Sequence, residues 1–235
     1  MTIHQKILPI SLNDEATFEN YLAGPNSIVI NYLKSFLKKN NQNNLERYLF
    51  LWGDLGTGCS HLLQAGCHFF LENYGSAVYL NFKNQQSLTP AIFDNLEQFD
   101  LVCLDDIHAV INKEVWEEAL FYFYNRCFEK NNLLIISAKK TPTQLSIRLP
   151  DLASRINSGV SLQLQHLTDE EKIQVLKMRA KRRGLLLSDE VCFFFLRRYP
   201  RDMKALFDAL ILLDRASLKK QRKVTIPFIK EVLNL

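Results

Sequence analysis

Residues 48–63 read YLFLWGDLGTGCSHLL, and this stretch decides the fold. It begins as an apolar run, passes through three glycines within six residues, and resumes as an apolar helical pattern. The pattern predicts a strand, a tight loop and a helix N-terminus. Gly53, Gly58 and Ser60 fit the phosphate-loop template of Gly, four residues, Gly, Lys, then Ser or Thr. Cys59 occupies the position of the template's lysine.

A phosphate loop binds an anion because backbone N–H groups and a helix N-terminus converge on it. The lysine normally reaches the β- and γ-phosphates, whereas Cys59 carries no positive charge and Asp54 adds a negative one. We therefore predict binding of ADP or another nucleoside diphosphate, with weak or no hydrolysis by this chain alone. The alternative is a glycine-rich turn that only resembles the motif. The predicted nucleotide contacts here are Gly53, Gly56, Thr57, Gly58, Cys59, Ser60 and His61.

A second candidate site is the apolar run LVCLDD at 101–106, which ends in two carboxylates. In a Walker B element, the first carboxylate binds Mg²⁺, directly or through water, and the second polarises the attacking water. We assign these roles to Asp105 and Asp106, with Ser60 as a further magnesium ligand. The alternative is a strand followed by a polar turn, but the spacing from the glycine loop favours Walker B.

Strand and helix patterns alternate through the first two thirds of the chain. The expected strands are 48–52, 77–80, 101–105, 133–136 and 162–164, and the expected helices are 60–74, 90–96 and 113–128. The strands are continuously apolar, which is typical of a parallel sheet with helices on both faces. After about residue 167 only helical patterns follow, beginning with the cap sequence Thr168-Asp-Glu-Glu171. The expected domains are an extended arm at 1–12, an α/β domain at 13–166 and a small all-helical domain at 167–235.

Composition excludes several classes of protein. The net charge of +4 is too mild to imply nucleic-acid binding by itself. The longest apolar runs fall far short of the roughly 20 residues that a spanning helix needs, so no membrane partner is expected. The five cysteines form no Cys-x-x-Cys pair, which is typical of a reducing, cytoplasmic environment without disulfides or zinc.

Three basic features outside the loop each have two interpretations. Arg155 lies between the fourth and fifth expected strands, where ring-forming ATPases carry an arginine that enters a neighbour's nucleotide site; the alternative is a surface ion pair with Asp151. Arg201 is expected to open a helix. It either contacts a phosphate or lies on a solvated face of that helix. The basic runs at 177–183 and 219–223 are solvated helix faces, or contact DNA or an acidic partner.

With these residues in hand, the chain resembles the DnaA-related AAA+ ATPases over essentially its whole length. The segments that carry the resemblance are TFENY at 17–21, GPN at 24–26, SHLL at 60–63, LDDI at 104–107, LPDLASR at 149–155 and RDM at 201–203. The resemblance implies an AAA+ fold: a five-stranded parallel sheet with flanking helices, followed by a helical lid. It also implies that Tyr21 lies near the adenine, that Arg155 is an arginine finger acting in trans, and that Arg201 is the second sensor.

The segment QRKVTIPF at 221–228 resembles specifically the regulatory inactivators of DnaA, which stimulate hydrolysis of DnaA-bound ATP and so limit initiation of replication. The sequence ends soon afterwards, where DnaA continues into a DNA-binding domain. The implied partners are DnaA and the polymerase sliding clamp (its β subunit) on DNA, and a homo-oligomer is left open. The N-terminal arm, read alone, is either a docking peptide or packed on its own domain. The resemblance favours docking on the clamp, through Gln5, Leu8, Pro9 and Ile10.

Two positions depart from the family pattern. Cys59 replaces the basic residue of the loop, and Lys139 stands where the first sensor is expected to be acidic. Both favour a chain that hydrolyses little ATP itself. The alternative functions are a helicase-loader-like AAA+ ATPase acting on DNA, and a nucleotide-free scaffold that only bridges the clamp and DnaA.

Overall fold

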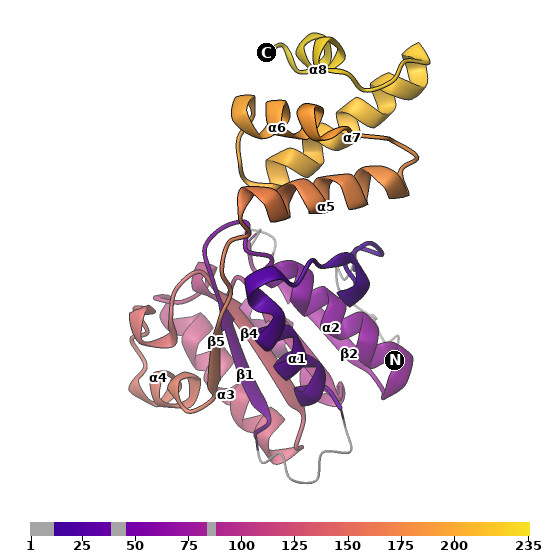
Figure 1. Cartoon of the computed structure of the whole chain (residues 1–235). Coiled ribbons are helices and arrows are strands. Elements are labelled where there is room, and N and C mark those ends of the chain that lie inside the picture. Colours follow the sequence, from indigo (N-terminus) through magenta and orange to yellow (C-terminus); the bar gives the residue numbers. More distant parts are fainter. Residues whose placement is uncertain (1–11, 39–45, 84–87) are drawn as a thin grey trace, which may run out of the picture. The chain divides into compact units, whose positions relative to one another are not determined.

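The computed structural model describes residues 12–38, 46–83 and 88–235, which form two compact units (Figure 1). Of the described residues, the sheet unit contains 12–21 and those within Asn26–Asp54 and Gly58–Leu164. The lid unit is built from Gln165–Leu235, and the short segments Leu22–Pro25 and Leu55–Thr57 group with it.

The sheet has five parallel strands in the order β2-β3-β4-β1-β5. Their bounds are Tyr48–Trp52 for β1, Ala77–Asn81 for β2, Leu101–Asp105 for β3, Leu133–Ala138 for β4 and Val160–Gln163 for β5. Every residue of β3 and β4 is buried, so both faces of the sheet are covered, as the continuous apolar runs predict. Because all five strands are parallel, the loops after β1, β3 and β4 leave from one edge, where ligands bind in open α/β sheets.

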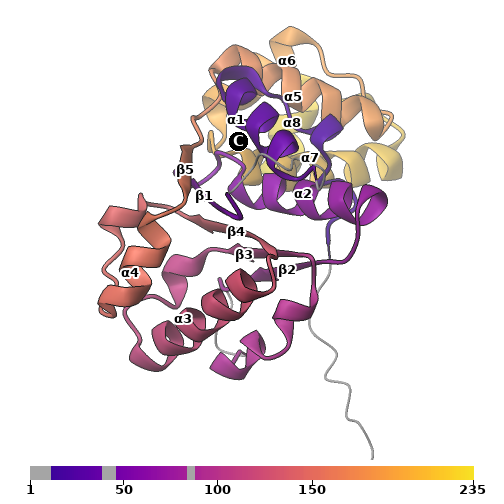
Figure 2. The same cartoon turned by 90° about the horizontal axis from the view of Figure 1, so that it is seen from below.

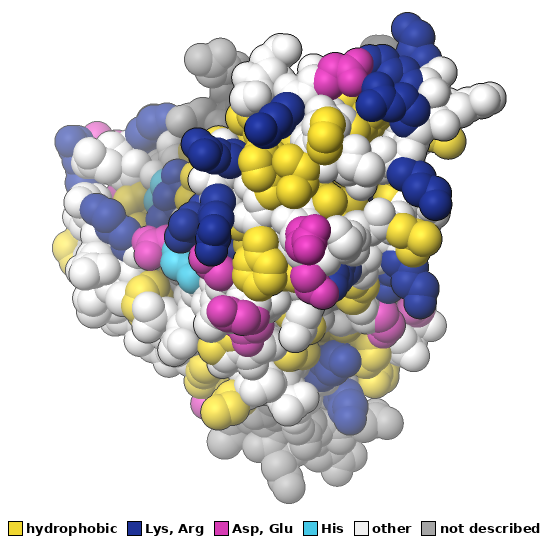
Figure 3. All heavy atoms as spheres, turned by 45° about the horizontal axis from the view of Figure 1, so that its top comes forward, with side chains coloured by type: hydrophobic (Ala, Val, Ile, Leu, Met, Phe, Trp, Pro, Cys, Tyr) yellow, Lys and Arg dark blue, Asp and Glu magenta, His cyan; other side chains and the backbone are white. Residues whose placement is uncertain are grey.

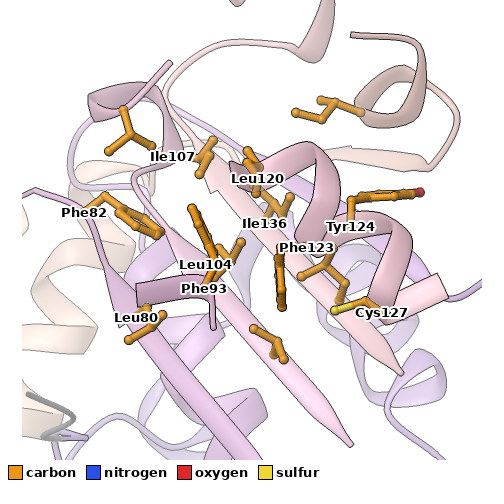
Figure 4. Close-up of a cluster of buried hydrophobic side chains, with 14 of the residues drawn as sticks. Leu80, Phe82, Phe93, Leu104, Ile107, Leu120, Phe123, Tyr124, Cys127 and Ile136 are labelled. Atoms are coloured by element: carbon orange, nitrogen blue, oxygen red, sulfur yellow. The ribbon is translucent and has the colours of Figure 1, made fainter. Parts of the chain in front are cut away.

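Helices cover both faces of this sheet (Figure 2). Helices α1 (Ser27–Phe36) and α2 (Cys59–Asn73) lie on one face, and α3 (Glu114–Glu129) lies on the other beside α4 (Pro150–Asn157). Between α3 and the sheet is a cluster of buried apolar side chains (Figure 4), in which the rings of Phe93 and Phe123 stack with centroids 5.3 Å apart. This packing fixes α3 relative to the strands.

The buried stripe of α3 differs at its end from the one that its apolar spacing predicts. The sequence predicts a single stripe of Trp116, Leu120, Phe123, Tyr124 and Phe128. Phe128 is, however, 64% exposed, and Cys127 is buried instead. Position 127 is seven residues after Leu120 and so returns to the same helix face, whereas position 128 lies one residue further around. Burial raises the pKa of the Cys127 thiol to about 12, which makes it an inert core residue.

The predicted helix at 90–96 is wrong. Two short 3-10 helices, Pro90–Phe93 and Leu96–Gln98, occupy this region. Asn95 between them has φ of +67°, which an α-helix does not permit. Phe93 and Leu96 are still buried, so the apolar pattern that suggested a helix reports burial here and not helical periodicity.

The lid contains four helices: α5 (Asp169–Arg182), α6 (Asp189–Arg198), α7 (Met203–Lys220) and α8 (Ile226–Leu233). The predicted cap of α5 is confirmed, since the Thr168 hydroxyl accepts from the backbone N–H of Glu171 and the Glu171 carboxylate accepts from that of Thr168. The lid has a buried core of its own, around Leu206, Leu210 and Phe228. The predicted fold, a parallel α/β sheet followed by an all-helical lid, is confirmed. Within the described ranges, the helices are too short or too polar to cross a bilayer.

Candidate nucleotide-binding site

The glycine loop connects β1 to α2 as the sequence predicts. Gly56 and Gly58 have φ of +90° and +98°, a backbone conformation that residues other than glycine rarely adopt. Gly58 is the N-cap of α2 and has no side chain, so the N-terminal end of the helix receives no side-chain cap from this position. A phosphate group suits this position because the helix dipole also favours negative charge there.

Tyr21 and His61, both predicted nucleotide contacts, lie together beside this loop. Their ring centroids are 5.4 Å apart, and the Tyr21 ring lies so close to Gly58 that a Cβ atom there would be 2.6 Å from it. Asn26 donates to the Tyr21 hydroxyl at 3.2 Å, and a ring nitrogen of His61 lies 2.8 Å from the carbonyl oxygen of Thr17. Tyr21, which precedes α1, and His61, in α2, therefore form an aromatic wall next to the phosphate loop.

We expect Gly58→Ala to destabilise the protein because of this close approach. The positive φ alone costs about 1–3 kcal/mol, and the contact with Tyr21 adds to that cost. Gly184→Ala is the matched control: Gly184 has φ of +74° but nothing within 4 Å of its Cβ position. Urea unfolding of both variants measures the difference. Equal losses would contradict the tight packing of Tyr21 on the loop.

Asp105, the candidate magnesium ligand, is fully buried at the end of β3. Its Oδ2 accepts hydrogen bonds from the Tyr79 hydroxyl at 2.7 Å and from the Asn81 amide at 2.6 Å, while its Oδ1 accepts from the Ser137 hydroxyl. Burial and the adjacent Asp105 carboxylate raise the pKa of Tyr79, so this phenol remains a donor. The donors thus come from the neighbouring strands β2 and β4.

These contacts decide how well the site fits magnesium. Direct coordination needs a carboxylate oxygen that faces the nucleotide, whereas both oxygens of Asp105 are enclosed by neutral donors. The residues present therefore do not fit an ion bound directly to Asp105. Ser60, the other candidate ligand, is the second residue of α2 and is half-buried.

Asp106 and His108 form a second titratable pair at the same edge. Burial and the nearby Asp105 raise the pKa of Asp106, whereas burial lowers the pKa of His108. The His108 Nδ1 lies 3.8 Å from the Asp106 Oδ1, too far for a hydrogen bond. Lys139, directly after β4, is close enough to lower both pKa values. Both groups are thus shifted toward their neutral forms.

Arg155, the candidate arginine finger, is exposed in the last turn of α4. Within the described parts of the chain it makes no ion pair with a carboxylate, so the predicted alternative, a pair with Asp151, is not formed. Arg201 does not open a helix as predicted but lies just before Asp202, the N-cap of α7. It is paired with Asp169 at 3.4 Å, and its own side chain is 62% exposed. Each arginine remains accessible to a ligand.

The family follows from comparison with known proteins. Residues 12–163 match the family model of the bacterial DnaA ATPase domain. The chain belongs to this family. Residues 169–233 match the model of the Hda lid domain. The chain is therefore an Hda-like, DnaA-related AAA+ protein, and the two family models together support a regulator related to DnaA in DNA replication.

Individual proteins and solved structures are similar to most of this chain, and the structures show the fold alone. An uncharacterized protein of Haemophilus influenzae is 45% identical over 229 residues, which is 97% of each chain. Domain III of DnaA from Thermotoga maritima is similar in fold, with a TM-score of 0.81 and 21% identity, over 95% of this chain and 98% of that one. AMPPCP-bound DnaA from Aquifex aeolicus has a TM-score of 0.70 at 21% identity, over 89% and 71% of the two chains.

Sequence reasoning missed several residues of this DnaA-family site. The Asp105 carboxylate is held by Tyr79, Asn81 and Ser137. Each is a polar residue within an apolar strand pattern, and the pattern itself does not indicate what it contacts. In a parallel sheet, Asn81 stands in register with Asp105, so a polar residue at the carboxyl end of the preceding strand was the available signal. Outside this site, the buried Glu117 was also missed, because a glutamate in an amphipathic helix is usually solvated.

Four of the nine basic side chains in the two runs of the Hda-like lid form ion pairs within the lid. On the face shown in Figure 3, Lys and Arg side chains stand among acidic and apolar ones and form no continuous basic patch. The guanidinium of Arg179 also lies 4.0 Å from the centre of the Phe207 ring. This pairing favours the interpretation as solvated helix faces. The ion pairs are Lys177–Asp189, Arg183–Asp214, Lys220–Glu231 and Arg222–Glu231.

Proposed function

We propose that this chain accelerates the hydrolysis of ATP bound to DnaA by supplying Arg155 in trans, and thereby negatively regulates initiation of replication. The observation that carries the proposal is an exposed arginine, unpaired within the described residues, on a DnaA-family unit whose own loop lacks the lysine. An arginine finger stabilises the charge of the transferring phosphoryl group and accelerates hydrolysis by roughly 10³ to 10⁵. A donor of such an arginine need not hydrolyse ATP itself.

The chain's own loop holds a nucleoside diphosphate, ADP in particular, as a structural ligand. Backbone N–H groups at the start of α2 bind its phosphates, and the aromatic wall of Tyr21 and His61 lies beside them. Cys59 cannot neutralise a γ-phosphate, so ATP gains no additional contact there. Arg201 is the candidate second sensor, and Asp106 is the group that remains free to polarise water.

ADP binding is expected to depend little on magnesium, since donors enclose Asp105. Isothermal titration with Mg²⁺ or with EDTA should give ADP affinities within about tenfold of each other, or 1.4 kcal/mol. Tyr79→Phe removes one of the donors to Asp105 and is expected to increase the magnesium dependence. Tight binding that disappears in EDTA would contradict this assignment for Asp105.

The N-terminal arm, residues 1–12, would bring the protein to DNA by docking on the sliding clamp. Gln5, Leu8, Pro9 and Ile10 lie outside the described residues, so docking on the sliding clamp rests on their sequence and on the Hda-like lid. An extended peptide of this kind binds a partner through a few anchoring side chains. Clamp-bound chains would be concentrated on replicated DNA, where DnaA has to be inactivated.

The test is an ATP-hydrolysis assay of DnaA with and without this chain, sliding clamp and DNA. The proposal requires that this chain stimulates the hydrolysis, and that at limiting concentrations of the chain the stimulation also needs the clamp and DNA. Two results would favour an ATPase acting on DNA instead: robust ATP turnover by the isolated chain, and salt-sensitive binding of single-stranded DNA. Purified chain that contains no nucleotide and binds none would favour a scaffold.

A further inference from the structure

Glu117 is a buried carboxylate that no part of the nucleotide site uses. It lies in the first turns of α3 and is only 1% exposed. Its Oε1 accepts from the backbone N–H of Asn112 at 2.7 Å, and its Oε2 accepts from those of Arg148 and Leu149, both at 2.9 Å. A carboxylate that accepts backbone N–H bonds makes charge-assisted hydrogen bonds, which are roughly twice as strong as neutral ones.

The segment that Glu117 holds leads directly into the helix of Arg155. Leu149 is the N-cap of α4, and Pro150 is its first residue. The Arg148 side chain adds a further tie, because its Nε donates to the Asn112 side chain. Glu117 and Asn112 together therefore fasten the chain just before α4 to the start of α3.

The other end of α4 also lies against α3. Tyr124 lies seven residues after Glu117, on the same face of α3; burial raises the pKa of its phenol, whereas Ser158 and Arg155 at the end of α4 lower it. The Ser158 hydroxyl donates to the carbonyl oxygen of Arg155 at 2.8 Å and closes the end of the helix. Between these ends, Leu152 and Ile156 are fully buried in the core cluster. The two helices lie side by side in Figure 2.

We propose that Glu117 is a positioning residue for Arg155, which it aims by holding the start of α4. This inference rests on the proposed function of Arg155 in trans. Glu117 itself touches neither nucleotide nor partner in this role. A misplacement of about 1 Å can cost on the order of 10²-fold in rate, so a helix that is anchored at one end only would present the guanidinium poorly.

The decisive variant is Glu117→Gln, which keeps the shape of the side chain but removes its charge and turns one acceptor into a donor. We expect the maximal rate of stimulated hydrolysis to fall by roughly 10-fold to 100-fold. The concentration of variant that gives half-maximal stimulation should change little, because the docking surfaces are intact. The matched control is Glu118→Gln, since Glu118 is the exposed neighbour on the same helix.

Hydrogen exchange supplies a readout that does not depend on DnaA. The backbone amides of Asn112, Arg148 and Leu149 should be protected in the wild-type protein and exchange faster in Glu117→Gln, while the core amides of β4 remain protected. If the Gln variant does not fold, Asn112→Gly serves instead. It suits the φ of +68° at this position and removes only the tie to Arg148, and it should give a smaller loss of maximal rate.

Three outcomes separate the two proposals. A folded Glu117→Gln variant with faster exchange at Arg148 and Leu149 but wild-type stimulation would overturn the positioning role. Unchanged exchange at these amides would overturn it as well, whatever DnaA does. If the wild-type chain gives no stimulation, the proposed function of Arg155 fails, and the exchange data alone then test whether Glu117 holds α4.

Discussion

Arg155→Ala is expected to abolish the stimulation of DnaA-bound ATP hydrolysis. In the proposed function, the guanidinium is the group that this chain adds to the transition state, and its loss should reduce the stimulated rate by roughly 10³-fold or more. Binding to the sliding clamp should be unchanged, because the proposal assigns that contact to the N-terminal arm. The measurement is single-turnover hydrolysis of ATP on DnaA, with clamp-loaded DNA and saturating amounts of the variant.

Two further substitutions in α4 make this result specific. Arg155→Lys keeps the charge but loses the planar fork that binds two phosphate oxygens, so it should be nearly as defective as the alanine variant. Ser154→Ala alters the exposed residue next to Arg155 and should leave stimulation intact. Wild-type stimulation by Arg155→Ala would rule out the finger, and equal losses in Ser154→Ala would indicate damage to the helix.

The direction of Arg155 is set by the packing of α4 within the sheet unit. Arg155 lies on a helix that is packed into the core of the sheet unit, with Leu152 and Ile156 fully buried. Its direction is therefore fixed by α3 and the sheet. In the proposed function, a nucleotide in the glycine loop need not aim the arginine, so the replacement of the loop lysine by Cys59 should leave the trans reaction unaffected.

Much of this architecture could be predicted from the sequence, since its signals are local. The run 48–52 is continuously apolar and precedes a glycine loop, which defines β1, the phosphate loop and α2. Asp105 ends an apolar strand, and the parallel sheet brings strand ends to one edge. The Thr168 cap depends on two side chains three residues apart, and it is present as predicted.

The rest depends on contacts between residues distant in sequence. Nothing near Glu117 indicates that its carboxylate meets the backbone of Arg148, because this contact requires the fold to bring α3 against the start of α4. The enclosure of Asp105 likewise needs the order of strands β2-β3-β4. Asn95 illustrates a third reason: its left-handed conformation interrupts a segment whose apolar pattern would equally suit a helix.

The double variant Gln5→Ala, Leu8→Ala is expected to abolish binding to the sliding clamp. If each side chain is an anchor, its removal costs at least about 2 kcal/mol, so the two together should weaken binding by more than about 100-fold. Surface plasmon resonance on immobilised clamp measures the loss. Lys6→Ala is the matched control, since position 6 lies in the variable interior of the same peptide, and it should bind like wild type.

The same double variant should separate docking from chemistry. Arg155 and its helix are untouched, so stimulation should return when the variant is supplied at a concentration high enough to replace docking on the clamp. This follows from mass action: the clamp raises the local concentration of the chain near DnaA and makes no contact with the phosphoryl group. Wild-type clamp binding by the double variant would refute the arm. Stimulation that stays absent at every concentration would show that the clamp also orders the finger for catalysis.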